Sequence, residues 1–120
     1  MGSGIASVAA QAGYSVKLYD RVPGAARAAL IGLASDLARQ VKKGRFTAEE
    51  ARKIQGGLEA VESLEDLADS GLVIEAIVEN PGVKIDLFRA LDDIVAPDAI
   101  LATNTSSLSI DAIAAPTRRP

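Results

Sequence analysis

Apolar and polar positions change along the chain between a helical period and a strand-like period. Residues 4–12 are small and suit a helix, and Gly13 is placed to cap it and let the chain reverse. In the run YSVKLYD that follows, Tyr14, Val16 and Leu18 fall on one side of an extended chain. The start of the chain is therefore predicted to form a helix, a tight turn and a strand.

Two amphipathic helices are predicted next. Pro23 suits the first turn of the first one. Its apolar residues recur at spacings of three and four until about Gly44; they are Ala26, Leu30, Leu33, Leu37 and Val41. The second helix is predicted to begin after Thr47, because Thr47 and Glu50 form the capping-box pattern.

The second half of the chain repeats the alternation of strand and helix. The run SGLVIEAIVEN is nearly continuously apolar and rich in β-branched residues, which is typical of a central parallel strand buried on both faces. After Pro81, VKIDLFRALDDIV is amphipathic, and AILATNTSS is a short apolar strand that breaks into polar residues. This order predicts an α/β fold with a parallel sheet, in a single domain over residues 1–120.

Composition narrows the possible functions. The net charge of −3 argues against a protein that binds nucleic-acid phosphates. Without any cysteine or histidine the chain cannot form disulfides or the usual zinc and copper sites, and no metal site is predicted. No apolar run is long enough to span a bilayer, and no signal peptide is evident, so we expect a cytoplasmic protein without membrane contact.

The first candidate site combines the opening glycines with an acid. Gly2 and Gly4 are spaced as in the dinucleotide-binding pattern G-x-G-x-x-G, but the next glycine position is Ser7. Asp20 ends the predicted strand 18 residues after Gly2, and an acid at about this distance binds ribose hydroxyls in nucleotide-binding units. The alternative is that the glycines have no function and that Asp20 is only a polar residue at a strand end.

Further candidates follow the two later strands. Glu79 comes directly after the apolar run, where open α/β sheets bind ligands, although Glu79 and Asn80 equally suit a helix cap. Lys84, taken by itself, fits a solvated helix position. The hydroxyl and amide groups of ATNTSSLSI can hydrogen-bond a substrate and a cofactor, or cap a helix. A catalytic Ser-His pair within the chain is excluded, because the chain has no histidine.

Three segments together, MGSGIASVAAQAGYSVKLYD, LVIEAIVEN…VK…LF and ILATNTSSLSI, resemble the NAD-binding domain of the 3-hydroxyacyl-CoA dehydrogenases, including the 3-hydroxybutyryl-CoA dehydrogenases. The resemblance implies a Rossmann-type, doubly wound, mainly parallel sheet. In that family a strand and the loop G-A-G-x-M-G open the domain, and Met1 and Gly2 match the end of this loop. The chain is thus expected to lack the first strand and the helical C-terminal domain.

The resemblance also assigns residues. It implies that Gly2 belongs to the loop around the cofactor NAD, that Asp20 binds the adenosine ribose, and that Glu79, Lys84 and Ser106 lie along the cofactor. Ser106 would also hydrogen-bond the 3-oxygen of the substrate, which makes it the candidate catalytic residue. The charge of Asp20 would repel a 2′-phosphate and so favours NAD over NADP.

Lys43 matches a family position that contacts coenzyme A through its phosphates. Asp36 matches a family position at which a serine can bind the same ligand. The negative charge of Asp36 would repel a phosphate. The family's general base is a histidine in an H-F-F-N-P segment, and this chain contains no histidine. By themselves, the 120 residues are therefore expected to catalyse no turnover.

The implied reaction is the NAD-dependent oxidation of (S)-3-hydroxyacyl-CoA to 3-oxoacyl-CoA, in fatty-acid β-oxidation or butanoate-type metabolism, by a longer homodimeric enzyme. Its place would be the cytoplasm, or the mitochondrial matrix in a eukaryote. Two alternatives remain. NADH binding without turnover would favour a non-catalytic nucleotide-binding or interaction module, and a folded chain without binding would favour a structural protein.

Overall fold

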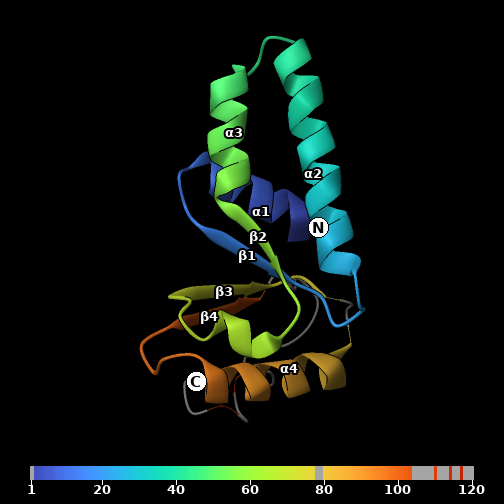
Figure 1. The fold of residues 1–120 in the computed structure, drawn as a ribbon. Coiled ribbons are helices and arrows are strands. Elements are labelled where there is room, and N and C mark those ends of the chain that lie inside the picture. Colours follow the sequence, from blue (N-terminus) through green and yellow to red (C-terminus); the bar gives the residue numbers. More distant parts are fainter. Residues whose placement is uncertain (1, 78–79, 104–109, 111–113, 115–116, 118–120) are drawn as a thin grey trace. The chain divides into compact units, whose positions relative to one another are not determined.

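The chain is built from helices and short strands, as the sequence predicts (Figure 1). The computed structural model describes residues 2–77, 80–103, 110, 114 and 117. The elements are, in order, α1 (Gly2–Gln11), β1 (Val16–Tyr19), α2 (Ala25–Lys42), α3 (Ala48–Gly56), β2 (Leu58–Val61), the 3₁₀ helix η1 (Leu64–Leu67), β3 (Leu72–Glu75), α4 (Pro81–Ile94) and β4 (Ile100–Thr103). They divide into two compact units, residues 1–63 and residues 64–120. That the chain forms one domain stays a prediction.

The first unit opens with the predicted helix, turn and strand. Gly13 has a φ of 96°, and the N–H of Tyr14 donates to the carbonyl of Ala9 across the end of α1. This is the Schellman arrangement, which needs a residue with positive φ and therefore favours glycine. Tyr14 itself is 69% exposed, because it belongs to this turn and not to β1, so its predicted place beside Val16 and Leu18 is wrong.

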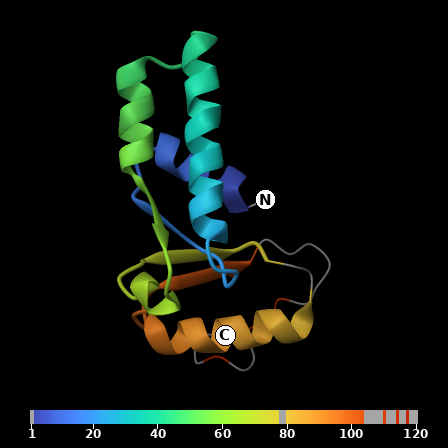
Figure 2. The same ribbon diagram turned by 45° about the vertical axis from the view of Figure 1, so that its right-hand side comes forward.

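The predicted helical pair α2 and α3 stands side by side in both views (Figures 1 and 2). Helix α2 begins two residues after Pro23, which therefore precedes the first turn, and it ends at a second Schellman turn in which Gly44 has a φ of 76°. The capping box that begins α3 is confirmed. The N–H of Glu50 donates to Thr47 Oγ1 over 3.1 Å, and the N–H of Thr47 donates to Glu50 Oε1 over 3.0 Å.

Strand β2 pairs in parallel with β1, from Val16 opposite Leu58 to Tyr19 opposite Val61. Strand β2 is absent from the sequence predictions. Aliphatic side chains from the helices and β2 form the core of this unit, with the partly buried Val16 and Leu18 of β1 packed against it. The buried core residues are Ala6, Ala10, Leu33, Leu37, Ala51, Ile54 and Leu58. The predicted apolar stripe of α2 thus faces the core.

The second unit contains a parallel pair, β3 and β4, with Leu72 opposite Ile100 and Glu75 opposite Thr103. The parallel direction is as predicted, but the predicted burial of the strand on both faces is wrong. Leu72 is 54% and Ile74 44% exposed, because within this unit α4 packs on the opposite face, toward which Glu75 points. Buried side chains of α4, among them Phe88 and Leu91, fill the space between the helix and the pair.

Among the residues that the structure describes, no helix is long and apolar enough to cross a membrane.

Candidate functional site

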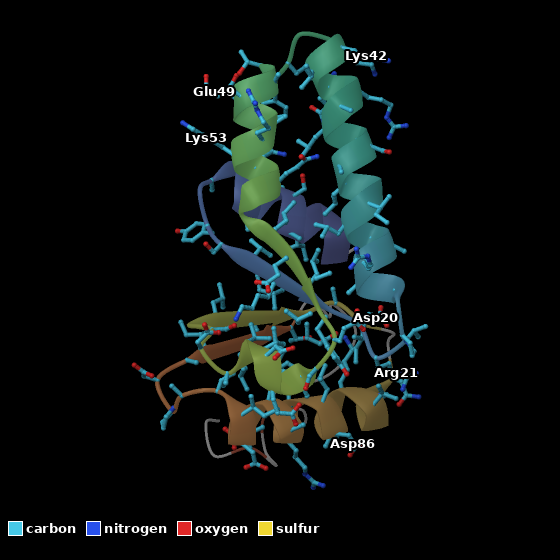
Figure 3. The ribbon with its side chains drawn as sticks, in the orientation of Figure 1. Asp20, Arg21, Lys42, Glu49, Lys53 and Asp86 are labelled. Atoms are coloured by element: carbon cyan, nitrogen blue, oxygen red, sulfur yellow. The ribbon has the colours of Figure 1, made fainter. Side chains whose placement is uncertain are left out.

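In the first unit, the reversal at Gly13 brings the start of α1 and the end of β1 to the same end. Helix α1 begins at Gly2, and Asp20 directly follows β1. The start of α1 and Asp20 lie on the same side of this unit in the view of Figures 1 and 3. A helix N-terminus at the same end as an acid at the carboxyl end of a strand suits a phosphate and a ribose.

The side chain of Asp20 is exposed and locally fixed. Its Oδ1 accepts a hydrogen bond from the N–H of Val22 over 2.9 Å, which is the geometry of an Asx turn. Figure 3 shows Asp20 and Arg21 at the end of β1. The carboxylate therefore remains available to solvent and to hydroxyl groups of a ligand.

Lys43 lies at the other end of α2. Helix α2 has 18 residues and is about 27 Å long, with Asp20 before its first residue and Lys43 after its last one. Lys43 is exposed. Asp36 forms an exposed ion pair with Arg39, one turn along the same helix. This partner offsets part of the negative charge that would repel a phosphate.

The second unit contains a buried cluster of polar groups at the carboxyl ends of its strands. Lys84 Nζ donates to Glu75 Oε1 over 2.9 Å and to Oε2 over 2.8 Å. Thr103 Oγ1 donates to Oε1 over 2.5 Å, and the N–H of Ile77 donates to Oε2 over 2.7 Å. Glu75 is 3% and Lys84 0% exposed, so this ion pair lies out of contact with water.

Local structure explains why these groups meet. Glu75 ends β3, and the parallel register places Thr103, the last residue of β4, directly opposite. Asn80 caps α4 by accepting a hydrogen bond from the N–H of Val83 over 3.1 Å, which sets Lys84 in the first turn of the helix. The capping role that the sequence suggested for Asn80 is confirmed.

The structure corrects the reading of Lys84 as a solvated helix residue. Its stem is buried under the strands because its ammonium group has an anionic partner there. The partner, Glu75, is absent from the sequence predictions, and Thr103 is present there only as one of the hydroxyl groups of ATNTSSLSI. A signal for Glu75 was present, since it is the acid in the middle of the apolar run LVIEAIV, and a charge in such a run needs a partner.

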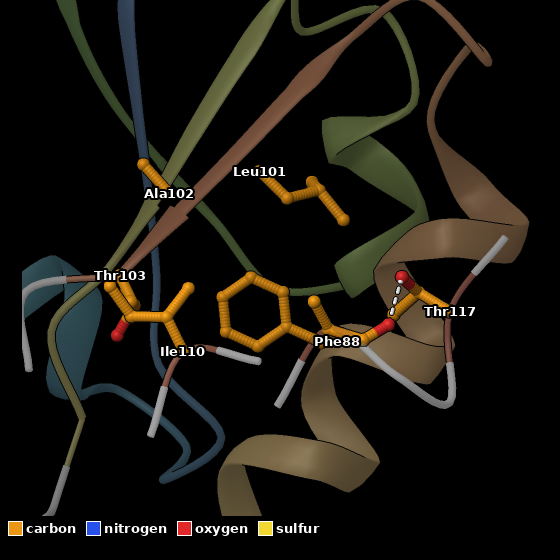
Figure 4. Close-up of a pocket in the computed structure, with 7 residues that line it drawn as sticks. Phe88, Leu101, Ala102, Thr103, Ile110 and Thr117 are labelled. Carbon is orange, nitrogen blue, oxygen red and sulfur yellow. Dashed lines mark hydrogen bonds between the residues drawn. The ribbon is translucent and has the colours of Figure 1, made fainter. Parts of the chain in front are cut away.

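Thr103 connects the cluster to a pocket of about 290 Å³ within the second unit. The pocket lies beside α4 and β4 and is mostly apolar (Figure 4). It is lined by Phe88, Leu101, Ala102, Thr103, Ile110, Ala114 and Thr117. Two predicted site residues, Glu79 and Ser106, lie outside the described residues. Within the described part of the chain, no three acidic side chains are grouped to hold a metal ion.

Comparison with known proteins identifies the family. Residues 1–120 match the family described as 3-hydroxyacyl-CoA dehydrogenase, NAD binding domain. The chain belongs to this family. The cofactor of this family of domains is NAD, as predicted.

The names of individual relatives agree with this family assignment. A probable 3-hydroxybutyryl-CoA dehydrogenase of Bacillus subtilis is 47% identical over 120 residues, which are all of this chain and 42% of the relative. The alpha subunit of the fatty acid oxidation complex of Colwellia psychrerythraea is 33% identical over 120 residues, or 17% of its length. The chain thus spans less than half of these relatives.

Solved structures establish the fold. The crystal structure of 3-hydroxybutyryl-CoA dehydrogenase from Escherichia coli matches with a TM-score of 0.94 and 42% identity, over 98% of this chain and 25% of the other. The structure of Mycobacterium tuberculosis FadB2 matches with a TM-score of 0.93 and 42% identity, over 98% of this chain and 42% of the other. The domain therefore has the Rossmann-type α/β fold that the sequence predicts.

The described residues of this NAD-binding domain fit its cofactor. Asp20 offers an exposed carboxylate at the same end of its unit as the helix start at Gly2. Lys84 and Glu75 place charged groups at the carboxyl ends of β3 and β4, where open α/β sheets bind ligands. The roles of Gly2, Asp20 and Lys84 toward NAD stay predictions.

Proposed function

We propose that this NAD-binding domain serves the NAD-dependent oxidation of (S)-3-hydroxyacyl-CoA to 3-oxoacyl-CoA. The observation that supports this most strongly is the match of all 120 residues to the family's NAD-binding domain, together with relatives named 3-hydroxybutyryl-CoA dehydrogenase. The polar groups at the ends of the strands supply further support, because they lie where such a fold binds its ligands.

In this proposal the residues of the first unit hold the adenosine half of NAD. Asp20 accepts hydrogen bonds from the ribose hydroxyls, and its charge disfavours the 2′-phosphate of NADP. The helix that begins at Gly2 directs backbone N–H groups and its positive end toward the diphosphate. Lys84, Glu79 and Ser106 lie along the cofactor.

The chemistry divides between cofactor and protein. Bound NAD supplies the acceptor for the hydride that leaves C3 of the substrate. Ser106 orients the substrate by a hydrogen bond to its 3-oxygen. The proton of the 3-hydroxyl needs a general base, and because this chain has no histidine, the family's histidine base is not among these residues.

The coenzyme A part of the substrate is placed at the far end of α2. Lys43 is exposed there and attracts phosphate groups. The ion pair between Asp36 and Arg39 supports this assignment, since Arg39 offsets the charge of Asp36. We further infer that the working enzyme is a homodimer in fatty-acid β-oxidation or butanoate-type metabolism, located in the cytoplasm, or in the mitochondrial matrix in a eukaryote.

The experiment is a titration of the 120-residue chain with NADH and with NADPH, followed by fluorescence, together with an assay of NADH production from (S)-3-hydroxybutyryl-CoA. We expect NADH to bind more tightly than NADPH, and no turnover by these residues alone. Failure of a folded chain to bind NADH would overturn the proposal. Steady turnover would overturn the assignment of the base to a histidine outside these residues.

The alternative function is a non-catalytic nucleotide-binding or interaction module. Such a module would bind a nucleotide through the same residues, Asp20 and the helix start at Gly2, without turnover. The two functions separate when the source cell's own product is isolated and assayed. Dehydrogenase activity of that product would support the enzyme, and NADH binding without activity would support the module.

A further inference from the structure

The carboxylate of Glu75 ties together three segments of the second unit. Its two oxygens accept hydrogen bonds from the ammonium group of Lys84 in α4, from the hydroxyl of Thr103 at the end of β4, and from the backbone N–H of Ile77 just after β3. A single side chain thus fixes the chain beyond one strand, the end of the next strand and the first turn of a helix.

Stability alone does not account for this arrangement. Burying both charges carries a large desolvation penalty, and apolar residues of similar volume often stabilise a protein as well or better. Both partners are nonetheless almost fully buried. The pair also lies at the carboxyl ends of parallel strands, where this type of sheet binds its ligands.

Geometry determines which of the two residues organises the other. Glu75 is on a strand that is held by its pairing with β4, and its carboxylate is fixed additionally by Thr103 and by the N–H of Ile77. Lys84 has a long and flexible stem, and an ammonium group adopts one position only where acceptors define it. Both oxygens of the Glu75 carboxylate accept a hydrogen bond from this ammonium group.

We propose that Glu75 is the positioning residue of the cofactor site. It sets the location of the Lys84 ammonium group and holds Ile77, just after β3, and Thr103, the last residue of β4, in the arrangement that accepts NAD. Glu75 acts through Lys84, Ile77 and Thr103 and does not itself contact the cofactor. This role rests on the proposed function, because the site it organises is the NAD site.

Two variants of the 120-residue chain test this role, each titrated with NADH and unfolded with urea. Glu75→Gln keeps the size of the side chain and an acceptor but removes the charge that holds Lys84. The double variant Glu75→Leu, Lys84→Met replaces the ion pair by an apolar pair. We expect both variants to bind NADH at least about tenfold more weakly, the effect of losing a hydrogen bond to a charged group.

Stability separates positioning from packing. The double variant is expected to unfold at the same urea concentration as the wild type or a higher one, since no unpaired charge remains buried. Hydrogen exchange adds a readout that needs no cofactor. In Glu75→Gln the amides of Ile77 and Lys84 should exchange faster, while those of the capping box at Thr47 should not change.

The results that would contradict the proposal concern either the positioning role or the proposed function. Wild-type affinity for NADH in either variant would overturn the positioning role, because the charges would then serve packing alone. Unchanged exchange at Ile77 and Lys84 would overturn it as well. If the folded wild-type chain does not bind NADH, the proposed function fails and the role of Glu75 toward NAD fails with it.

Discussion

Asp20 and Glu75 are both acids at the carboxyl end of a parallel strand, yet their surroundings are opposite. Asp20 is exposed and is held by one hydrogen bond from a backbone group two residues away. Glu75 is buried and is bound by groups two, nine and 28 residues away in sequence. An exposed acid can be replaced at little cost to the fold, whereas the buried one couples the fold to the site.

The largest loss in the free energy of unfolding is expected when one charge of the buried pair is removed. Lys84→Met leaves the carboxylate of Glu75 buried without its cation, and breaking such a pair typically costs about 3–5 kcal/mol in the free energy of unfolding. Urea unfolding measures this value. Arg89→Met removes an exposed cation from the same helix and is the matched control. A loss no greater than that of the control would contradict the buried geometry.

Asp20→Asn tests the other side of the comparison. Replacing the carboxylate by an amide removes charge-assisted hydrogen bonds to ribose hydroxyls, so NADH should bind about tenfold more weakly, or about 1.4 kcal/mol. Because Asp20 is exposed, the free energy of unfolding in urea should not change. Fluorescence titration with NADH and NADPH measures both affinities.

The control for this variant is Asp86→Asn, which neutralises an exposed acid on α4. It has the same effect on net charge and should leave both affinities unchanged. Equal losses in the two variants would mean that overall charge and not a ribose contact is responsible. Undiminished discrimination against NADPH in Asp20→Asn would remove Asp20 from the cofactor site.

The same contrast explains what the sequence could and could not predict. The turns at Gly13 and Gly44 and the capping box at Thr47 are local, because each depends on residues within one turn of helix. The position of Asp20 is local in the same sense, since it follows its strand directly. Local chemistry is enough to predict most helix ends and the place of the exposed acid, whereas its role toward NAD stays a prediction.

Features that depend on distant partners were missed or misread. Strand β2 reads LEAV, with Glu59 and Ala60 in its middle, and becomes a strand through its pairing with β1. The burial of Lys84 depends on a carboxylate in another element, and Thr103 joins the cluster only through the register between β3 and β4. A single sequence contains no measure of these distances.

Helix caps provide a comparison between the units in which equal effects are expected. Thr47 accepts a hydrogen bond from the N–H of Glu50, and Asn80 accepts one from the N–H of Val83, each over 3.1 Å. Thr47→Ala and Asn80→Ala should each lower the free energy of unfolding by about 1 kcal/mol, the usual value of an N-cap. Urea unfolding measures both free energies. Ala48→Gly is not a suitable control, because it also changes helix propensity.

Asn80 lies four residues before Lys84 in the unit that contains the buried cluster, whereas Thr47 belongs to the other unit, so the two variants should differ in a second measurement. Asn80→Ala loosens the helix turn that bears Lys84 and should weaken NADH binding, whereas Thr47→Ala should leave it unchanged. Equal NADH affinities in the two variants would show that the first turn of α4 does not contribute to the site.

The smallest effect is expected on the exposed surface of α2. Arg39 pairs with Asp36 one turn away, and both side chains are more than half exposed, 69% and 53%. Arg39→Ala should lower the free energy of unfolding by only about 0.2–0.5 kcal/mol, because water and salt screen such pairs. The loss should shrink further in high salt. Urea unfolding at low and high salt measures it, and a salt-independent loss above about 1 kcal/mol would mean that the stem of Arg39 contributes packing and not charge.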